Sequence, residues 1–122
     1  MANSVGFHEA EARLTSGTLD MHRALASLQE ELEAIDWYQQ RIDATGDEDL
    51  RAILRHNRDE EQEHAAMVLE WIRRKDPGFA THLRAYLFTE GPITEREAAA
   101  TNGAVPVANA VVSVGSLRGG RR

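Results

Sequence analysis

With 122 residues, of which 42% are hydrophobic and 28% charged, the chain has the size and composition of one small soluble domain. No stretch approaches the roughly 18 consecutive apolar residues of a membrane span, and the N-terminus lacks the basic start and apolar run of a secretory signal. The cytosol is therefore the expected compartment. Because the chain has no cysteine, any metal ion must be bound by oxygen or imidazole ligands.

The formal charge of −6 is distributed unevenly along the chain. Residues through Glu97 carry 11 basic and 20 acidic side chains, whereas the remaining residues carry three arginines and no acidic side chain. Nucleic-acid binding is not expected, because contact with phosphates requires a basic face. The acidic residues gather in two runs, at 30–36 and 59–63. Such runs are usually solvated helix faces, but here both surround the candidate site described below, which favours the gathering of cations.

Two long helices are predicted first. The first is expected from about Thr18 to Ala44, because apolar residues recur there at heptad spacing: Leu14, Met21, Leu28, Ile35 and Ile42, with Leu25 and Leu32 between them. Gly46 should close this helix in a left-handed C-cap conformation, and Asp47 should be the N-cap of the second helix. The second helix is expected to end near Lys75.

Two short helices are expected to follow. Asp76-Pro77 is typical of a helix start, and the apolar face of this third helix holds Phe79, Leu83, Tyr86 and Leu87. Thr94 and Glu97 match the capping box of a short fourth helix. From Ala98 onward, small residues, glycine, asparagine and proline predict a flexible linker. We therefore expect an all-α domain over residues 1–97, followed by a linker and tail over residues 98–122.

One face of the second predicted helix turns polar in its middle. Apolar residues hold both ends of this face, whereas Asn57, Glu61 and His64 hold the positions expected to be most buried. A buried carboxylate without a partner costs several kcal/mol, so Glu61 requires a compensating charge. Glu61 and His64 form a Glu-x-x-His pair on one helix face, which is typical of half a metal site. The whole face comprises Leu50, Leu54, Asn57, Glu61, His64, Val68 and Trp71.

The hairpin should bring a further carboxylate to the same height. Glu31 lies 15 residues before Gly46 and Glu61 lies 15 residues after it, so the two should be opposite each other in an antiparallel pair. Glu31 flanks the apolar seam and can turn inward, whereas Glu30 and Glu33 should be more exposed. The predicted ligand set is therefore Glu31, Glu61 and His64.

Three ligands are too few for a two-metal site. Ferritin-like di-iron bundles use a Glu from each of two helices and Glu-x-x-His from each of the other two, and this chain offers one helix of each kind. Two hairpins related by a two-fold axis would complete both a four-helix bundle and the site. A lone hairpin also cannot bury both seams, which favours a homodimer.

Other interpretations are open at this point. His64 could be a core histidine with Arg58 as a partial partner of Glu61, and Asn57 fits a seam residue that sets helix register. The chain could then be a non-enzymatic helical adaptor whose tail binds a partner. The site could also hold manganese or zinc without redox turnover. Three aromatic residues fit packing groups better than redox relays: Trp37, Tyr38 and Trp71.

Three segments closely resemble the encapsulated ferritins: EELEAIDWY at 30–38, NRDEEQEHAAM at 57–67 and YLFTEGPI at 86–93. This resemblance implies a half-ferritin, in which two-helix subunits dimerise into a ferritin-like four-helix bundle and the dimers assemble into an open ring. It implies that Glu31, Glu61 and His64 are the catalytic ligands of a di-iron ferroxidase centre. It also implies that Tyr38 and Trp37 lie nearby, and that Glu30 and Glu33 form an outer metal-uptake site.

The tail is similar to the peptides that load cargo into encapsulin shells. The segment runs from Val112 to Gly120, and its expected docking residues are Val112, Val114, Gly115, Ser116, Leu117 and Arg118. A tethered, mildly apolar segment of this kind can dock in a groove on a shell wall. Together the two resemblances imply oxidation of Fe(II) by dioxygen or peroxide inside an encapsulin nanocompartment, with the shell as the iron store.

Overall fold

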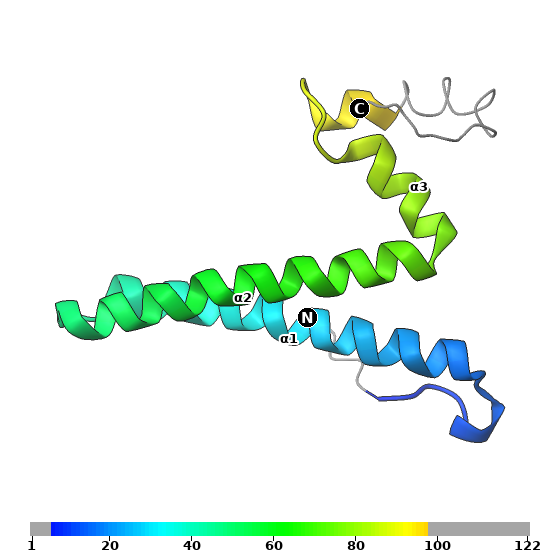
Figure 1. Cartoon of the computed structure of the whole chain (residues 1–122), viewed down its shortest axis with the longest axis horizontal. Helices are drawn as coiled ribbons and strands as arrows, with labels where there is room; N and C mark the ends of the chain where they lie inside the picture. The colour runs from blue at the N-terminus through cyan, green and yellow to red at the C-terminus, as the bar shows by residue number, and fades with distance from the viewer. Residues whose placement is uncertain (1–5, 98–122) are drawn as a thin grey trace. The chain divides into compact units, whose positions relative to one another are not determined.

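The structure, a computed structural model, describes residues 6–97 (Figure 1). It contains a short 3-10 helix, η1 (Glu11–Arg13), and three α-helices: α1 (Ser16–Ala44), α2 (Glu48–Lys75) and α3 (Pro77–Tyr86). Residues 93–97 are also helical, and the described residues contain no strand. The predicted all-α class is confirmed. The predicted linker and targeting peptide, at residues 98–122, lie outside the described residues.

The chain divides into two compact units, one through Pro77 and one from Gly78 onward. In the first unit, α1 and α2 form an antiparallel hairpin (Figure 1). The two helices lie close together near the turn and diverge toward the start of α1. In the second unit, Ala80 is buried, whereas the predicted apolar-face residues Phe79 and Leu87 are exposed. Among the described helices, none is long and apolar enough to cross a membrane.

Helix α1 begins at Ser16, two residues before the predicted start. Its N-cap is Thr15, whose hydroxyl oxygen accepts a hydrogen bond from the backbone N–H of Thr18 at 3.1 Å. Such a cap satisfies one of the free N–H groups of the first turn. The position of the capping side chain Thr15 therefore sets the start of the helix.

The left-handed conformation predicted for Gly46 is wrong. Gly46 does not have a positive φ angle, and the C-cap of α1 is Thr45 in an extended conformation (φ −77°, ψ 143°). Arg51 of α2 instead donates hydrogen bonds to the carbonyl oxygens of Ile42, at 3.0 Å, and of Thr45. Because the arginine satisfies carbonyls that α1 leaves free at its end, no left-handed glycine cap is needed.

The other predicted caps have mixed outcomes. Asp47 is the N-cap of α2, as predicted, and its carboxylate accepts a hydrogen bond from the backbone N–H of Leu50 at 2.8 Å. Helix α3 begins at Pro77, also as predicted. The predicted capping box at Thr94 is wrong. A capping residue precedes the first helical residue, whereas the helix begins at residue 93 and already includes Thr94.

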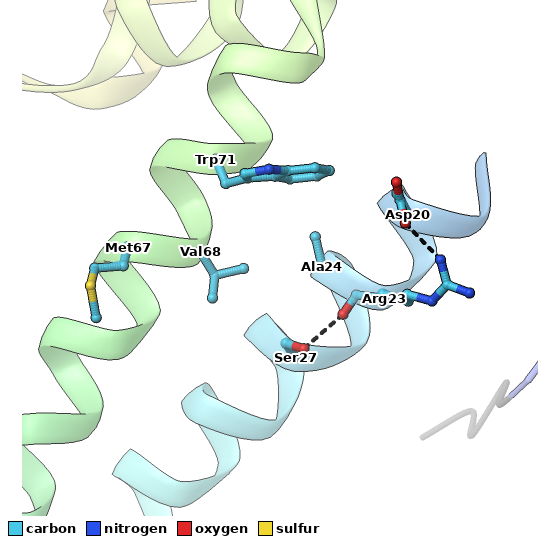
Figure 2. Close-up of a pocket in the computed structure, with 7 residues that line it drawn as sticks. All are labelled: Asp20, Arg23, Ala24, Ser27, Met67, Val68 and Trp71. Carbon is cyan, nitrogen blue, oxygen red and sulfur yellow. Dashed lines mark hydrogen bonds and ion pairs between the residues drawn. The ribbon is translucent and has the colours of Figure 1, made fainter. Parts of the chain in front are cut away.

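Few side chains of the α1–α2 hairpin are buried. Ile42 near the turn, Ala65 in the middle of α2 and Ile72 near its end are the buried apolar residues of these two helices. Leu25 and Leu32 of the predicted seam are 41% and 53% exposed. An open hollow also lies between the two helices (Figure 2), lined by Asp20, Arg23, Ala24, Ser27, Met67, Val68 and Trp71. The hairpin thus leaves part of its apolar surface uncovered, as expected for half of a bundle.

Candidate metal centre

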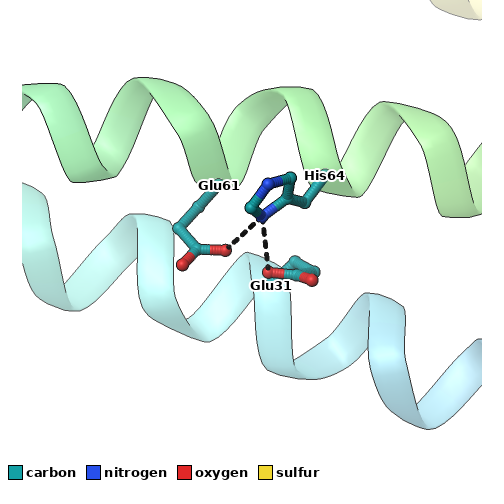
Figure 3. Close-up of side chains that lie close together, drawn as sticks. All are labelled: Glu31, Glu61 and His64. Carbon is teal, nitrogen blue, oxygen red and sulfur yellow. Dashed lines mark hydrogen bonds and ion pairs between the residues drawn. The ribbon is translucent and has the colours of Figure 1, made fainter.

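The three predicted ligands converge between the two long helices (Figure 3). Glu31 projects from α1, while Glu61 and His64 project from adjacent turns of α2. The Nδ1 atom of His64 lies 3.3 Å from Glu61 Oε1 and 4.0 Å from Glu31 Oε1. One donor atom from each residue lies within 4.8 Å of the other two. The register argument from the hairpin turn is therefore confirmed at the level of geometry.

The two carboxyl groups interact strongly with each other. A hydrogen bond with Glu61 raises the pKa of the Glu31 carboxyl, and desolvation and the negative charge of Glu61 raise it further. The same hydrogen bond lowers the pKa of Glu61, and the hydrogen bond with His64 lowers it further. The two carboxyls therefore titrate as a coupled pair, in which the pKa is raised at Glu31 and lowered at Glu61.

This donor set matches a hard or borderline divalent cation. Two carboxylates and one imidazole suit iron, manganese or zinc, and the chain has no thiolate that would favour a softer metal. Binding through Nδ1 of His64 requires the ring proton to reside on Nε2. The side chains are accessible in the single chain, since they are 26%, 24% and 44% exposed for Glu31, Glu61 and His64. A cation, or a second chain, can therefore reach the donors.

Arg58 does not compensate the charge of Glu61. The Nε and Nη2 atoms of Arg58 donate to Asp59 Oδ1 at 3.0 and 2.8 Å. Its Nη1 atom donates to Gln39 Oε1 on α1 at 2.7 Å. The suggested pairing of Arg58 with Glu61 is therefore wrong, and the interpretation of His64 as a core histidine loses the cation that it required.

The other residues implied by the resemblance lie outside the convergent set. Glu30 and Glu33 are exposed on α1, as predicted, and the described donor cluster does not include them. Trp37 is half exposed, and the ring of Tyr38 packs against the guanidinium of Arg41 at 5.5 Å. An outer metal-uptake site and a role for the two aromatic residues beside the centre stay predictions.

Sequence reasoning missed two polar contacts that organise the hairpin. One is the bond of Arg51 to the end of α1, and the other is the bond between Arg58 and Gln39 across the helices. Neither contact has a periodic signature, because a long arginine can reach several partners. An arginine within reach of a helix end was the one available signal for the first contact.

Comparison with known proteins agrees with these features. The sequence model of the EncFtn-like family matches residues 6–90. An encapsulated ferritin-like protein of Rhodospirillum rubrum is 53% identical, and the match covers 92% of this chain and 87% of that protein. An encapsulin nanocompartment cargo protein of Myxococcus xanthus, EncC, is 39% identical, and the match covers 92% of this chain and 95% of that protein.

A solved structure shows the same fold. The crystal structure of a protein from Nitrosomonas europaea superposes with a TM-score of 0.71 at 60% sequence identity, and the match covers 73% of this chain and 98% of that one. Because the family match spans more than half of the chain and includes both long helices, the comparison extends over the whole candidate centre. The chain belongs to the EncFtn-like family.

Proposed function

We propose that this protein is a ferroxidase that works as cargo of an encapsulin shell. The observation that carries the proposal is the convergence of Glu31, Glu61 and His64 from two helices. Membership of the EncFtn-like family supports it. Two relatives are named an encapsulated ferritin-like protein and an encapsulin cargo protein, which supports the shell as partner and as location.

In this proposal a homodimer completes the centre. One hairpin contributes one Glu from α1 and one Glu-x-x-His pair from α2, which is half of the ligand set of a ferritin-like di-iron bundle. A two-fold axis beside the donors would supply the other half. The exposed seam residues Leu25 and Leu32 would be covered by the same association. The dimers would then assemble into a larger ring.

The reaction that we propose is oxidation of the substrate Fe(II) to Fe(III). Each iron loses one electron, and two electrons with two protons convert dioxygen to hydrogen peroxide, or hydrogen peroxide to two molecules of water. The contribution of the protein is to hold two irons close together with hard ligands, so that one oxidant can take both electrons. Fe(III) would then leave for storage as mineral in the shell.

The direct test is to purify the protein without oxygen, add Fe(II) and follow oxygen or peroxide consumption together with native mass. We expect rapid oxidation with turnover above that of iron in buffer. A non-enzymatic adaptor would show neither turnover nor a change of mass. A manganese or zinc protein would change mass with those metals and leave Fe(II) oxidation at the rate of the buffer.

Cation binding should weaken as the pH falls. A metal must displace any proton held by the coupled Glu31–Glu61 pair, in which the pKa of Glu31 is raised, so the affinity decreases as this pair becomes protonated. We expect the affinity for Co(II), measured by calorimetry between about pH 5 and pH 7, to fall by up to about tenfold per pH unit for each proton displaced. Glu31→Gln should bind more weakly but with a shallower pH dependence.

The matched control for this prediction is Glu63→Gln. It removes an exposed carboxylate from the part of α2 that carries Glu61 and His64. It should leave both the affinity and its slope against pH unchanged. An equal slope in Glu31→Gln and in the unaltered protein would show that Glu31 does not carry the displaced proton.

Removing the tail should separate targeting from chemistry. Deleting residues 111–122 should leave iron oxidation by the free protein nearly unchanged, because the proposed ligands all lie in α1 and α2. The deletion should abolish co-purification with the cognate encapsulin shell protein when the two are co-expressed. The control is a tail of the same composition in scrambled order, which should also fail to enter the shell. Entry of the truncated protein into the shell would refute the targeting peptide.

A further inference from the structure

The three donors belong to two helices, so their spacing depends on the placement of α1 against α2. Glu61 and His64 are held one turn apart by α2 itself. Glu31 is tied to them only through the turn between the helices and through contacts of α1 with α2, and a shift of α1 by one helical residue moves it by about 1.5 Å along the helix axis. The 4.0 Å separation between Glu31 Oε1 and His64 Nδ1 therefore requires a contact that fixes the helix register.

Fully buried apolar side chains are few near the donors, and the seam residues that flank them, Leu28, Ile35 and Val68, are only half-buried. Ile42 is buried close to the turn and Ile72 is buried near the end of α2, while the side chain buried beside the donors is the small Ala65. Coiled-coil register is normally fixed by large apolar side chains that insert between those of the facing helix. Here the seam positions at this height are occupied by the polar residues Glu61 and His64, and the residue that faces them on α1 is the polar Glu31 (Figure 3).

A polar contact crosses the two helices close to this place. The Nη1 atom of Arg58 donates to Gln39 Oε1 at 2.7 Å. Arg58 lies one turn before Glu61 on α2, and Gln39 lies eight residues after Glu31 on α1. Side chains on a helix lean toward its N-terminus, so Arg58 reaches back toward the turn, where α1 is nearest.

Both partners of this contact are themselves held in place. The Nε and Nη2 atoms of Arg58 donate to Asp59 Oδ1, which fixes the plane of the guanidinium. Gln39 Nε2 donates to Asp43 Oδ1 at 3.0 Å, which orients its carbonyl oxygen toward Arg58. The Arg58 side chain is 22% exposed, so water competes less for this bond than at a fully exposed position.

We propose that the Arg58–Gln39 hydrogen bond fixes the register of α1 against α2 and so positions Glu31 opposite Glu61 and His64. We call this contact the register lock. The inference rests on the proposed function insofar as these three residues bind a cation. Arg58 and Gln39 do not contact the cation, so they are positioning residues. They act by limiting how far α1 slides along α2, and thus by setting the affinity and geometry of the centre.

The test uses the full-length chain, Co(II) as the probe metal and Gln39→Leu as the variant. Leucine keeps a similar volume and no charge but cannot accept the hydrogen bond from Arg58. We expect Co(II) affinity to fall about tenfold, the lower end of the effect of groups that orient metal ligands. The visible absorption of bound Co(II), which reports ligand geometry, should change as well.

Gln40→Leu is the matched control. Gln40 is the adjacent glutamine, it is exposed, and its amide donates to Asp36 Oδ1 of the same helix at 3.1 Å. This substitution therefore removes a glutamine–aspartate bond of the same kind without touching the contact between helices. It should leave the affinity and the absorption spectrum unchanged. If Gln39→Leu acted only by perturbing helix α1 in general, Gln40→Leu would change them as well.

A second measurement tests the lock without metal. Because the chain has no cysteine, spin labels can be placed at Gln29→Cys on α1 and Glu63→Cys on α2, both exposed positions. Labelled chains are diluted with unlabelled ones, so that only distances within one chain are recorded. In Gln39→Leu the distance distribution should shift or broaden by about 1.5 Å or more, one residue of helix rise.

The outcomes separate the two proposals. Gln39→Leu with unchanged Co(II) affinity, spectrum and label distance would overturn the register lock. Failure of the unaltered protein to bind Co(II) or Fe(II) would overturn the proposed metal centre, and the label distance would then decide the lock alone. A shift in label distance with an unchanged Co(II) spectrum would mean that the bond sets register but not the geometry of the centre, which also contradicts the proposal.

Discussion

Replacing His64 with alanine should lower the rate of iron oxidation by on the order of 100-fold or more, because each dimeric centre would lose both of its imidazole ligands. His64 is the donor whose Nδ1 faces both carboxylates, at 3.3 and 4.0 Å. Without it, the cation would be held by carboxylates that already compete for one proton. The measurement is the initial rate of Fe(III) formation after anaerobic protein is mixed with Fe(II) and oxygen.

His56→Ala is the matched control for this variant. His56 lies on the same helix, is 69% exposed and pairs with Glu60 at 3.2 Å within α2. Its removal deletes a histidine–glutamate pair at helical spacing that is remote from the convergent donors, so the oxidation rate should stay within about twofold. Circular dichroism of both variants checks that helix content is preserved.

The two carboxylate variants should behave like His64→Ala. Glu31→Ala and Glu61→Ala each remove two ligands from a dimeric centre, while Glu63→Ala removes an exposed neighbour and should have little effect. Iron oxidation at the normal rate by folded His64→Ala protein would refute the assignment of the centre, regardless of the rates measured for the carboxylate variants.

The helices and the donor set could be predicted because both follow from periodicity. Heptad spacing locates α1 and α2, and equal distances of Glu31 and Glu61 from Gly46 place them opposite each other in a hairpin. The structure brings these two residues and His64 together as expected. This part of the prediction depends on the regular geometry of the two helices and on the short turn between them, both of which can be read from residue spacing.

The details that failed depend on long side chains with several possible partners. Gly46 has the right residue type for a left-handed cap, but Arg51 reaches the free carbonyls of α1 and makes that cap unnecessary. Arg58 stands three residues before Glu61, yet its guanidinium binds Asp59 and Gln39. Sequence spacing shows which partners an arginine can reach, whereas the choice among them depends on the tertiary arrangement.

Removing metal should reduce the protein to monomers or loose dimers, and adding Fe(II) without oxygen should assemble it into larger rings. In a dimeric centre four carboxyl groups and two imidazoles would meet. The negative charge of Glu61 already contributes to the raised pKa of Glu31 within one chain, and a second chain would add to this repulsion. A cation would remove this repulsion and bind mainly to the assembled form, because only the dimer supplies the full ligand set. A metal concentration of about 100 times its Kd would then stabilise the assembly by about 2.7 kcal/mol, or roughly 100-fold in association constant.

The exposed seam explains why metal-free protein should still associate loosely. Leu25 and Leu32 are largely uncovered in the single chain, so apolar contact favours a dimer while the charged centre opposes it. Light scattering and native mass spectrometry with chelator, with anaerobic Fe(II) and with Co(II) measure the balance. Co(II) should drive assembly without oxidation, which separates assembly from turnover. Glu61→Ala should show the same mass with chelator and with either metal, because the centre loses two of its carboxylate ligands. An identical mass with chelator and with iron would place the centre away from the subunit interface.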